Sequence, residues 1–476
     1  MSTDIFCDIC VIGAGSGGLS VAAGAAQMGA RVVLIEKGKM GGDCLNYGCV
    51  PSKALLAAGH AAENARRAGR FGVDIPTVEA DGAKVFSRVH DVIDAIAPND
   101  SVERFEGFGV TVIQGAARFT GMSTVQADNR VIRAKKFVIA TGSRAFVPPI
   151  DGLEGLDVLT NENIFDLDHI PERLIVIGGG PIGCELAQAF RHLGAQVTIL
   201  EMFKIMPSDD VELVRVVRSR LQQDGVVVHE DIQVVRAEGA PGAPVIVARD
   251  QDGREHRIDG SHVLVAAGRR PNVMDLGLEH AGVDFSPKGI LVDARLRTSN
   301  KRIFAIGDVA GGFQFTHVAG YHAGIVIRNI LFKLPAKAKL SHVPWVTYTD
   351  PELAQAGLTE TQAQDRLGGG VRVLTWPFGD NDRAQAEGET DGLIKVVTTA
   401  KGKILGAGIV GPHAGDLIQP WVLAMEQGLK IGAMASTIAP YPTLGEISKR
   451  AAGSYYTASL FSDRTRKIVR FLLKYF

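Results

Sequence analysis

Two cysteines, Cys44 and Cys49, are the residues whose type and spacing bear most directly on chemistry. They lie in the segment Gly41-Gly42-Asp43-Cys44-Leu45-Asn46-Tyr47-Gly48-Cys49-Val50-Pro51-Ser52-Lys53. Two such cysteines can form a disulfide that accepts two electrons, or they can bind a metal ion. A tetrahedral metal site needs a second Cys or His pair, which this segment lacks, so we favour the redox pair and expect no metal. Helix signals begin beyond Pro51, so Cys49 is expected near a helix N-terminus, where the dipole favours the thiolate.

Two copies of one strand, turn, helix and strand pattern are the elements expected to position this pair. The first copy has an apolar run at 9–12, a small-residue helix pattern, a strand at 32–35 ending before Glu36, and the turn Gly13-Ala14-Gly15-Ser16-Gly17-Gly18. The second has a run at 174–177, a helix pattern, a strand at 197–200 ending before Glu201, and the turn Gly178-Gly179-Gly180-Pro181-Ile182-Gly183. The shared order and similar spacing indicate a duplicated βαβ architecture.

Each turn has the G-x-G-x-x-G spacing of a dinucleotide site. The first glycine permits the tight turn, the second lets the backbone approach a pyrophosphate, and the third lets the helix pack on the strand. The helix N-terminus then offers free N–H groups to the phosphates, and the acid after the second strand accepts hydrogen bonds from ribose. Two such units in one chain indicate electron transfer between two nucleotides, most commonly a flavin and a nicotinamide.

Further strand ends organise the rest of the chain. Apolar runs end at Ala140-Thr141-Gly142 and at Ala266-Ala267-Gly268, where each nucleotide domain would close. A third glycine-rich strand end at 304–308 indicates that the chain returns to the first domain after the second. After about Ser341 the pattern changes to mixed strands and helices, which indicates an α+β region.

The cysteine segment resembles the active-site signature G-G-x-C-x-N-x-G-C-x-P-S-K of the class I pyridine nucleotide-disulfide oxidoreductases, the family of dihydrolipoamide dehydrogenase, glutathione reductase and mercuric reductase. The resemblance covers nearly the whole chain. It implies an α/β fold with two Rossmann-like dinucleotide-binding domains, for FAD and NAD(P), and a C-terminal α+β dimerisation domain. The implied boundaries are 1–150 for the first part of the FAD domain, 151–270 for the NAD(P) domain, 271–340 for the second part of the FAD domain and 341–476 for the dimerisation domain.

The resemblance also implies an activity and site residues. Electrons would pass from NAD(P)H through FAD to a Cys44–Cys49 disulfide and on to a disulfide or other small acceptor, in a homodimer. Cys49 would be the thiolate beside the flavin, Cys44 the interchange thiol, Lys53 the lysine near flavin N5 and Glu185 its acidic partner. The FAD site would include Gly13, Gly15, Gly18, Glu36, Thr141, Gly142 and Asp308. The nicotinamide domain would contribute Gly178, Gly180, Gly183 and Glu201. Further cofactor-binding residues would be Gly42, Ala117, Ser143, Gly268, Arg269, Gly307 and Thr316.

The residues after the second nucleotide strand indicate which nicotinamide cofactor is used. Glu201-Met202-Phe203-Lys204 resembles the NAD-dependent dihydrolipoamide dehydrogenases. An acid at Glu201 repels a 2′-phosphate, which favours NADH over NADPH.

One C-terminal segment departs from the family pattern. Disulfide reductases of the family carry His-Pro-Thr-x-x-Glu, in which glutamate holds an acid/base histidine, whereas this chain reads Tyr441-Pro442-Thr443-Leu444-Gly445-Glu446. Tyr441 and Glu446 are expected to act across the dimer, but a tyrosine with a pKa near ~10 is a poor base at neutral pH. Exchange with dihydrolipoamide or glutathione is therefore expected to be inefficient. Because mercuric reductases carry tyrosine here, Hg(II) reduction is an alternative, as are a quinone or oxygen reductase using NADH and a redox sensor.

Composition and the remaining motifs set the broad class. The 476 residues are 46% hydrophobic and 22% charged with a formal net charge of -1, so no bulk attraction to nucleic acid is expected. The apolar stretch at 9–30 is preceded by Asp4 and Asp8 and interrupted by glycines, unlike a signal peptide, and we expect a cytoplasmic protein. Cys7 and Cys10 fall inside the first strand and are expected in the core.

The basic and apolar tail from Arg464 to Phe476 predicts a terminal helix. We favour its packing on the body or on a partner subunit over contact with an anionic membrane.

Overall fold

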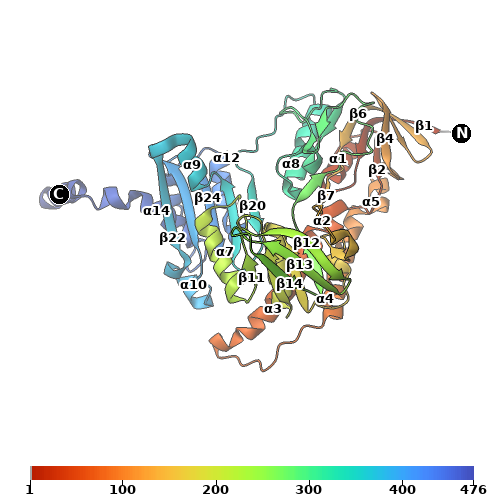
Figure 1. Cartoon of the computed structure of the whole chain (residues 1–476). Coiled ribbons are helices and arrows are strands. Elements are labelled where there is room, and N and C mark those ends of the chain that lie inside the picture. The colour runs from red at the N-terminus through yellow and green to blue at the C-terminus, as the bar shows by residue number, and fades with distance from the viewer. Residues whose placement is uncertain (1–2) are drawn as a thin grey trace. The chain divides into compact units, whose positions relative to one another are not determined.

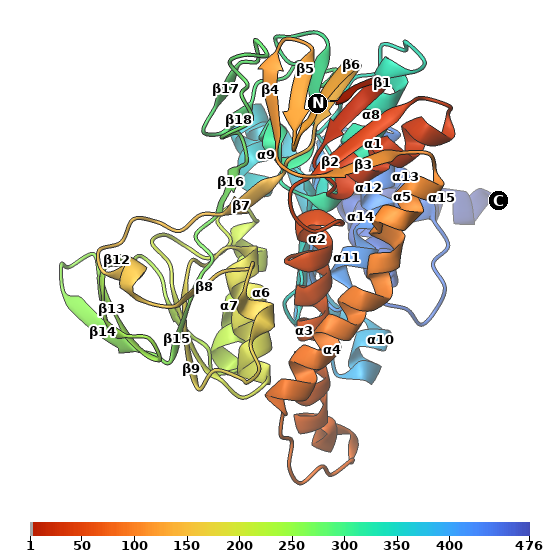
Figure 2. The same cartoon turned by 90° about the vertical axis from the view of Figure 1, so that its right-hand side faces the viewer.

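The computed structural model describes residues 3–476, and the chain forms two compact units. Unit 1 extends to Gly179 and includes Ala189–Met202 and Ile232–Lys339. Unit 2 comprises Gly180–Gln188, Phe203–Asp231 and Leu340–Phe476. Figures 1 and 2 show their elements in two views.

The first sheet of unit 1 is formed around the first nucleotide pattern. Its strand order is β3-β2-β1-β6-β5-β4, with β19 also paired to β6. These strands are β1 (Thr3–Ile12), β2 (Val32–Glu36), β3 (Thr111–Gln114), β4 (Ala117–Gly121), β5 (Thr124–Ala127), β6 (Arg130–Ile139) and β19 (Ile303–Ala305). The strands β1, β2, β3, β6 and β19 pair in parallel, whereas β4 and β5 form an antiparallel extension. Because β19 pairs with β6, the chain returns to this sheet, as expected.

Helices cover this sheet and place the first glycine turn. Helix α1 (Ser16–Gln27) packs beside α8 (Thr316–Ile330), and both contribute to one apolar core. Gly24 allows this approach, because a Cβ there would lie 2.6 Å from Cδ1 of Ile327. The other helices of the unit are α2 (Gly42–Asn46), α3 (Cys49–Arg66), α4 (Gly82–Ile96) and α5 (Val102–Gly107), with α3 and α4 side by side in Figure 2.

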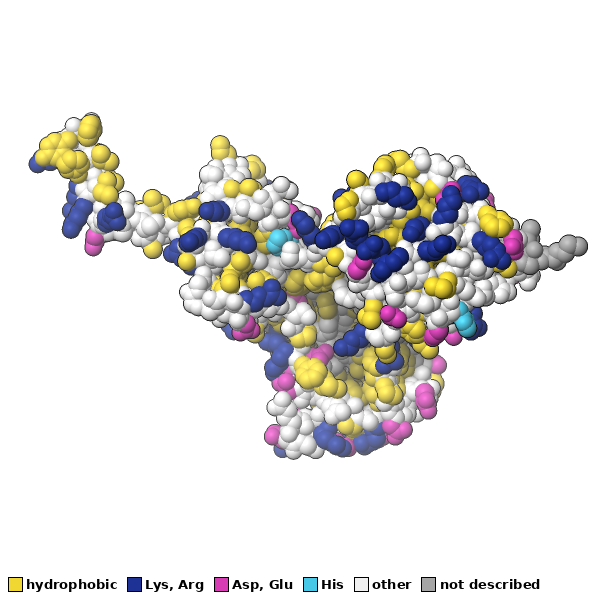
Figure 3. All heavy atoms as spheres, turned by 90° about the horizontal axis from the view of Figure 1, so that it is seen from above, with side chains coloured by type: hydrophobic (Ala, Val, Ile, Leu, Met, Phe, Trp, Pro, Cys, Tyr) yellow, Lys and Arg dark blue, Asp and Glu magenta, His cyan; other side chains and the backbone are white. Residues whose placement is uncertain are grey.

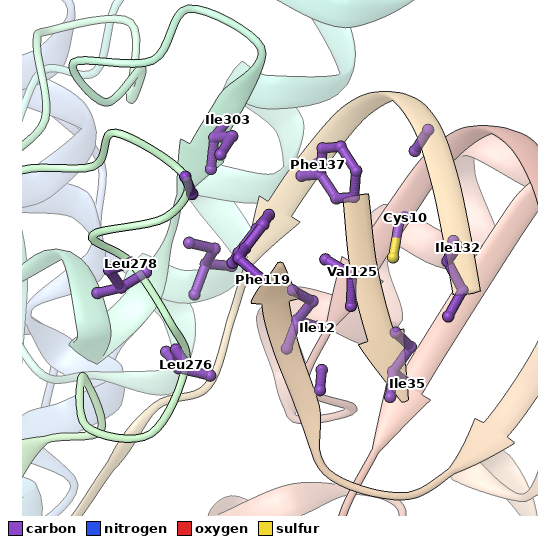
Figure 4. Packing of buried hydrophobic residues seen from close by; sticks show 14 of the residues in the cluster. Cys10, Ile12, Ile35, Phe119, Val125, Ile132, Phe137, Leu276, Leu278 and Ile303 are labelled. Carbon is purple, nitrogen blue, oxygen red and sulfur yellow. The ribbon is translucent and has the colours of Figure 1, made fainter. Parts of the chain in front are cut away.

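A second core of unit 1 is aromatic and aliphatic. The rings of Phe119 and Phe137 meet edge to face with centroids 5.3 Å apart (Figure 4). Cys7 and Cys10 are buried in this core, which confirms that expectation, and burial raises the pKa of Cys7 to about 12. A thiol held neutral by desolvation is a poor nucleophile and a poor metal ligand.

The second nucleotide pattern gives unit 1 a second parallel sheet. Four of its strands lie in the order β10 (Gln196–Leu200), β9 (Arg173–Ile177), β15 (His262–Val265) and β8 (Val158–Leu159). An antiparallel sheet follows, with β12 (Gln233–Ala240), β13 (Ala243–Arg249) and β14 (Glu255–Asp259). Two small ribbons pair β7 (Ser143–Ala145) with β16 (Arg269–Pro271), and β17 (Phe285–Ser286) with β18 (Gly289–Ile290).

Unit 2 is built on an antiparallel sheet with helices, which confirms the α+β expectation for the C-terminal region. The sheet order is β20 (Pro344–Thr347), β21 (Glu352–Gly357), β24 (Ile404–Gly411), β23 (Leu393–Thr399) and β22 (Val371–Pro377). Its helices are α7 (Val211–Gln223), α9 (Glu360–Leu367), α10 (Asp382–Glu387), α11 (Ala414–Leu417), α12 (Gln419–Glu426), α13 (Ile431–Ser436), α14 (Glu446–Leu460) and α15 (Asp463–Tyr475). The unit also holds β11 (Val227–His229) and the start of α6 (Pro181–His192). The buried Trp421 anchors this unit by donating its indole N–H to Ser448 Oγ at 3.0 Å.

Short 3₁₀ helices complete the described chain. They span Ala68–Phe71, Ala97–Asp100, Leu153–Gly155, Ile164–Asp166, Gly307–Ala310, Gly368–Gly370 and Phe378–Asp380. Across residues 3–476, no helix has the length and apolar character needed to cross a bilayer.

The expected packing of the C-terminal helix on the body is not seen. Figure 1 shows α15 leading away from the sheet of unit 2, and none of the 13 residues of this helix is buried in the structure of residues 3–476.

Candidate active site

The first glycine turn is shaped by close backbone approaches. Gly13 has a φ of 103°, and a Cβ there would lie 2.4 Å from the carbonyl oxygen of Ala140. A Cβ on Gly18 would lie 1.8 Å from the carbonyl oxygen of Gly13, so glycine is required at both positions. Glu36 fixes the turn by accepting the Ala14 N–H at 2.6 Å through Oε2.

The N-terminus of α1 is suited to a pyrophosphate. Its N-cap is Gly15, and among the described residues no side chain caps the first N–H groups of the helix. These N–H groups and the positive end of the helix dipole form an anion site. The turn therefore fits the phosphates of a dinucleotide such as FAD, and the predicted Gly13, Gly15, Gly18 and Glu36 come together there.

The second glycine turn repeats this geometry. Gly178 has a φ of 113°, and a Cβ there would lie 2.5 Å from the carbonyl oxygen of Ala266. Glu201 Oε2 accepts the Gly179 N–H at 2.6 Å, as Glu36 does in the first turn. Gly180 is open, with nothing described within 4 Å of a Cβ built there, and Gly183 is buried in α6. The acid after each second strand thus stabilises its turn, in addition to the ribose contact expected of it.

The two cysteines lie against the first turn. Cys44 is inside α2, and Cys49 is the first residue of α3, as expected from the sequence. Helix α2 approaches the turn closely, since a Cβ on Gly42 would lie 2.7 Å from Gly15 Cα. Cys49 Sγ lies 3.4 Å from Thr316 Oγ1 at the start of α8. The thiols are free and hydrogen-bonded to each other, and Cys44 also interacts with Ser16 of α1. The pair therefore sits between the N-termini of α1 and α8.

The two thiols have opposite acidities. The hydrogen bond from Cys44 lowers the pKa of Cys49 to about 6, with further help from Thr316 and the Lys53 ammonium, against opposing desolvation. The hydrogen bond to Cys49, together with burial, raises the pKa of Cys44 well above its ordinary value. At neutral pH the reduced pair is thus a Cys49 thiolate that accepts a hydrogen bond from a Cys44 thiol.

A chain of polar contacts links the cysteine segment to the ribbon of β7 and β16. Arg269 forms an ion pair with Asp43 at 3.0 Å and donates to Ser143 Oγ at 2.8 Å. Ser143 Oγ in turn donates to Asp308 Oδ2 at 2.5 Å, and burial raises the pKa of Asp308. Ser143, Arg269 and Asp308 were predicted as separate cofactor residues, whereas Asp43 was missed. No local motif marks Asp43, because its partner is distant in the chain.

Other predicted cofactor residues surround this chain. Thr141 is tied to Asn272 by two hydrogen bonds of 2.9 Å, a partner that the sequence did not indicate. The Gly307 N–H donates to Nδ1 of the buried His322 at 3.3 Å. Gly142, Gly268 and Gly307 have φ values of 67°, 113° and 67° and so need glycine. Ala117 differs from the rest, because its side chain packs in the aromatic core.

Lys53 and Glu185 fall in different compact units, so their pairing remains a prediction. Lys53 Nζ lies 3.4 Å from Ser52 Oγ on α3. Glu185 is buried and accepts the Tyr348 N–H at 2.9 Å.

Tyr441 is exposed and held by an aspartate. Its hydroxyl donates to Asp382 Oδ2 at 2.8 Å, at the start of α10. This hydrogen bond, together with the charge of Glu446, raises the pKa of Tyr441 above its ordinary value. Tyr441 is therefore a neutral donor at physiological pH, and even less of the phenolate that could act as a base is present than the sequence suggested. Asp382 was missed because it lies on a different element, 59 residues away.

Comparisons with known proteins agree with this geometry. The family model of the pyridine nucleotide-disulphide oxidoreductases matches residues 7–323, and the model of the family's dimerisation domain matches residues 343–452. A mercuric reductase of Staphylococcus aureus is 37% identical over 94% of this chain and 82% of its own length. A dihydrolipoyl dehydrogenase of Geobacillus stearothermophilus is 38% identical over 93% of this chain and 94% of its own length.

A solved structure is also similar. The Cu(II) complex of the HOCl-induced flavoprotein disulfide reductase RclA of Escherichia coli superposes with a TM-score of 0.85 and 26% identity, covering 95% of this chain and 100% of that one.

The chain therefore belongs to the pyridine nucleotide-disulphide oxidoreductase family. It is an FAD-dependent oxidoreductase that uses NAD(P)H, with the two dinucleotide-binding domains and the C-terminal dimerisation domain that the sequence predicted. The dimerisation domain supports a homodimer.

Proposed function

We propose that Cys44 and Cys49 form the disulfide that receives the electrons. The observation that carries this proposal is the position of the pair between Ser16 at the start of α1 and Thr316 at the start of α8, beside the turn that fits a dinucleotide. FAD, when bound, supplies the two-electron carrier between the nicotinamide and this disulfide. The chain itself supplies the Lys53 ammonium, which favours the Cys49 thiolate, and the Asp43–Arg269 ion pair, which fixes α2 to β16.

The acceptor is proposed to be one that needs no base from the enzyme. Attack of Cys44 on a disulfide requires its thiolate, yet its hydrogen bond to Cys49 raises its pKa. Tyr441 cannot take that proton, because its own hydroxyl proton is donated to Asp382. A soft metal ion such as Hg(II) binds thiols tightly and displaces their protons, so it meets this requirement. The mercuric reductases among the relatives support this choice.

NADH is proposed as the electron donor. Lys204 is the cation in this part of the sequence that could attract the 2′-phosphate of NADPH. Its ammonium forms an ion pair with Asp231 and lies 3.8 Å from Glu230 Oε2. The charge of Lys204 is thus already balanced, while Glu201 remains to repel a phosphate.

A complete site is proposed to need both subunits. Tyr441 and Glu446 belong to the region that the dimerisation domain covers, and Tyr441 is 68% exposed in the single chain. We infer that these residues, which lie inside the dimerisation domain predicted at 341–476, complete the dithiol site of the partner subunit.

An acceptor panel tests these roles. NADH-dependent turnover is measured with Hg(II), lipoamide and glutathione disulfide for the wild type, Cys44→Ser and Tyr441→His. We expect Hg(II) to be the best of the three, Cys44→Ser to lose turnover, and Tyr441→His to raise the lipoamide rate about tenfold or more by restoring a base. Asp382→Ala is the matched control, because it removes the acceptor of the Tyr441 hydroxyl without adding an imidazole.

Each alternative predicts a different result. Fast lipoamide turnover by the wild type would contradict the proposed acceptor, but it would not contradict the proposed role of Cys44 and Cys49. Full turnover by Cys44→Ser with quinone or oxygen would instead identify a reductase that bypasses the cysteines. Reduction of the flavin without turnover on any acceptor would indicate a redox sensor.

A further inference from the structure

The last helix, α15, is amphipathic and uncovered. Ser462 caps it by accepting the Thr465 N–H at 3.2 Å, so α15 begins at a defined residue and is a separate helix from α14. None of its described residues is buried. The helix is exposed although many of its side chains are apolar.

The apolar side of α15 is large. Its apolar residues are between 46% (Val469) and 79% (Leu473) exposed, and they recur at helical spacing. They are Ile468, Val469, Phe471, Leu472, Leu473 and Tyr475. The Phe471 and Tyr475 rings lie one turn apart with centroids at 4.9 Å, so they form one aromatic surface. Such a contiguous apolar surface indicates a binding partner.

The opposite side of α15 is basic. Arg466, Lys467, Arg470 and Lys474 recur three and four residues apart and therefore share one face. Asp463 is the acid of this helix, and it lies 3.6 Å from Arg466 at the N-terminal end, away from the aromatic surface. The space-filling view shows hydrophobic and basic side chains together on the protruding C-terminal helix (Figure 3).

The charge and the length of α15 indicate which partner covers its apolar face. Pairing with a second copy of α15 through the apolar face would leave the basic face without counter-charges, whereas anionic lipid headgroups complement it. Thirteen residues rise about 20 Å, short of the ~30 Å hydrocarbon core, so the helix cannot span a bilayer but can lie in its surface. The dimerisation-domain match ends at residue 452, before α15 begins at Asp463.

We propose that α15 docks the enzyme on an anionic membrane surface, with its apolar face in the headgroup region and its basic face toward the phosphates. The helix lies flat, so the contact is peripheral and reversible. The proposal does not depend on the identity of the electron acceptor.

Cosedimentation of the FAD-loaded full chain with lipid vesicles tests the proposal. Vesicles of phosphatidylcholine with one quarter phosphatidylglycerol are compared with phosphatidylcholine alone. Phe471→Ser/Leu472→Ser removes apolar contact, and we expect at least about a tenfold loss of binding. Arg470→Gln/Lys474→Gln should lower binding to the anionic vesicles about 25-fold, since each cation contributes about fivefold.

A matched control distinguishes vesicle binding through α15 from nonspecific binding through any exposed aromatic residue. Phe71 is 57% exposed, against 58% for Phe471, and the Arg70 guanidinium lies 4.8 Å from its ring centroid. Phe71→Ser should bind vesicles as the wild type does, and all variants should keep NADH-dependent flavin reduction without vesicles. Absent wild-type binding, or unchanged binding of both α15 variants, would overturn the proposal. A change of dimer mass in Phe471→Ser/Leu472→Ser by light scattering would also overturn it and assign α15 to a subunit interface.

Discussion

The two glycine turns share one local geometry and differ in what lies over them. In both, the first glycine has a φ above 100° and faces a strand-end carbonyl, and a glutamate accepts a turn N–H at 2.6 Å. Over the first turn lies the cysteine helix α2, with Gly42 against Gly15 Cα. Over Gly180, by contrast, no described atom comes within 4 Å of a Cβ position. A turn built into the dithiol centre suits a cofactor that stays, whereas an open turn suits a nicotinamide that binds and leaves.

The largest expected effect comes from breaking the first turn. In Gly18→Ala the new Cβ would meet the Gly13 carbonyl oxygen at 1.8 Å, a backbone contact that cannot move without distorting the turn. We expect about 3 kcal/mol or more of destabilisation and loss of most bound flavin, measured by thermal unfolding and by the ratio of flavin to protein absorbance. Gly107→Ala is the control, because in the described structure a Cβ there meets nothing within 4 Å. Full flavin content in Gly18→Ala would show that the turn does not hold the cofactor.

A substitution that distorts the second turn should impair the use of NADH without changing the flavin content. Gly178→Ala places a Cβ 2.5 Å from the Ala266 carbonyl oxygen at a φ of 113°. We expect normal flavin content but about a 100-fold slower reduction of flavin by NADH in stopped flow, because strain of about 3 kcal/mol falls on the nicotinamide turn alone. Gly180→Ala is the companion variant, expected to keep its stability and lose NADH affinity. If Gly178→Ala also lost its flavin, the two turns would not be independent.

The acidity of Cys49 sharpens the contrast further, because a thiolate lies beside the first turn. With a pKa of about 6, the thiolate is mostly present at pH 7 and mostly protonated at pH 5. Alkylation of the reduced enzyme by iodoacetamide should therefore slow about tenfold from pH 7 to pH 5. Lys53→Met removes a stabilising charge and should move this profile to higher pH, whereas Lys84→Met, on the exposed side of α4, should not. A profile centred near the ordinary thiol pKa would contradict the proposed thiolate.

The smallest effect is expected from the acid of the second turn. Glu201→Gln keeps an oxygen for the Gly179 N–H but removes the charge that repels a 2′-phosphate. The ratio of kcat/KM for NADPH to that for NADH should rise about tenfold. Lys204→Gln should change this ratio less than about threefold, because Asp231 already pairs with that ammonium. A larger effect of Lys204→Gln would mean that the lysine contacts the cofactor.

The sequence predicted those parts of the fold and site that depend on short spacing. Both turns, their glutamates and the position of Cys49 at a helix start follow from residues within about one βαβ unit of each other. The return of the chain at β19 was also foreseen, because the strand-end pattern repeats.

The remaining site geometry could not be predicted, because it depends on tertiary contacts. The contact of the Thr316 hydroxyl with Cys49, 267 residues away in the chain, was not predicted, and the role of Thr316 in cofactor binding stays a prediction. The Asp43–Arg269 pair and the Tyr441–Asp382 hydrogen bond likewise join separate elements. The helix α15 was predicted, but packing on the body is not seen and the alternative of a partner subunit stays a prediction, since an amphipathic pattern does not specify what will cover it.

The ribbon of β7 and β16 has a consequence for how such enzymes can diversify. Ala145 lies opposite Arg269, so the segment that leaves the first sheet after β6 and the segment that leads back towards it run side by side. The Phe146 N–H donates to the Gly268 carbonyl at 2.9 Å, and this hydrogen bond extends the pairing of the two segments. We therefore expect that the segment 146–268 could be replaced through two neighbouring connections, without rethreading any strand of the first sheet.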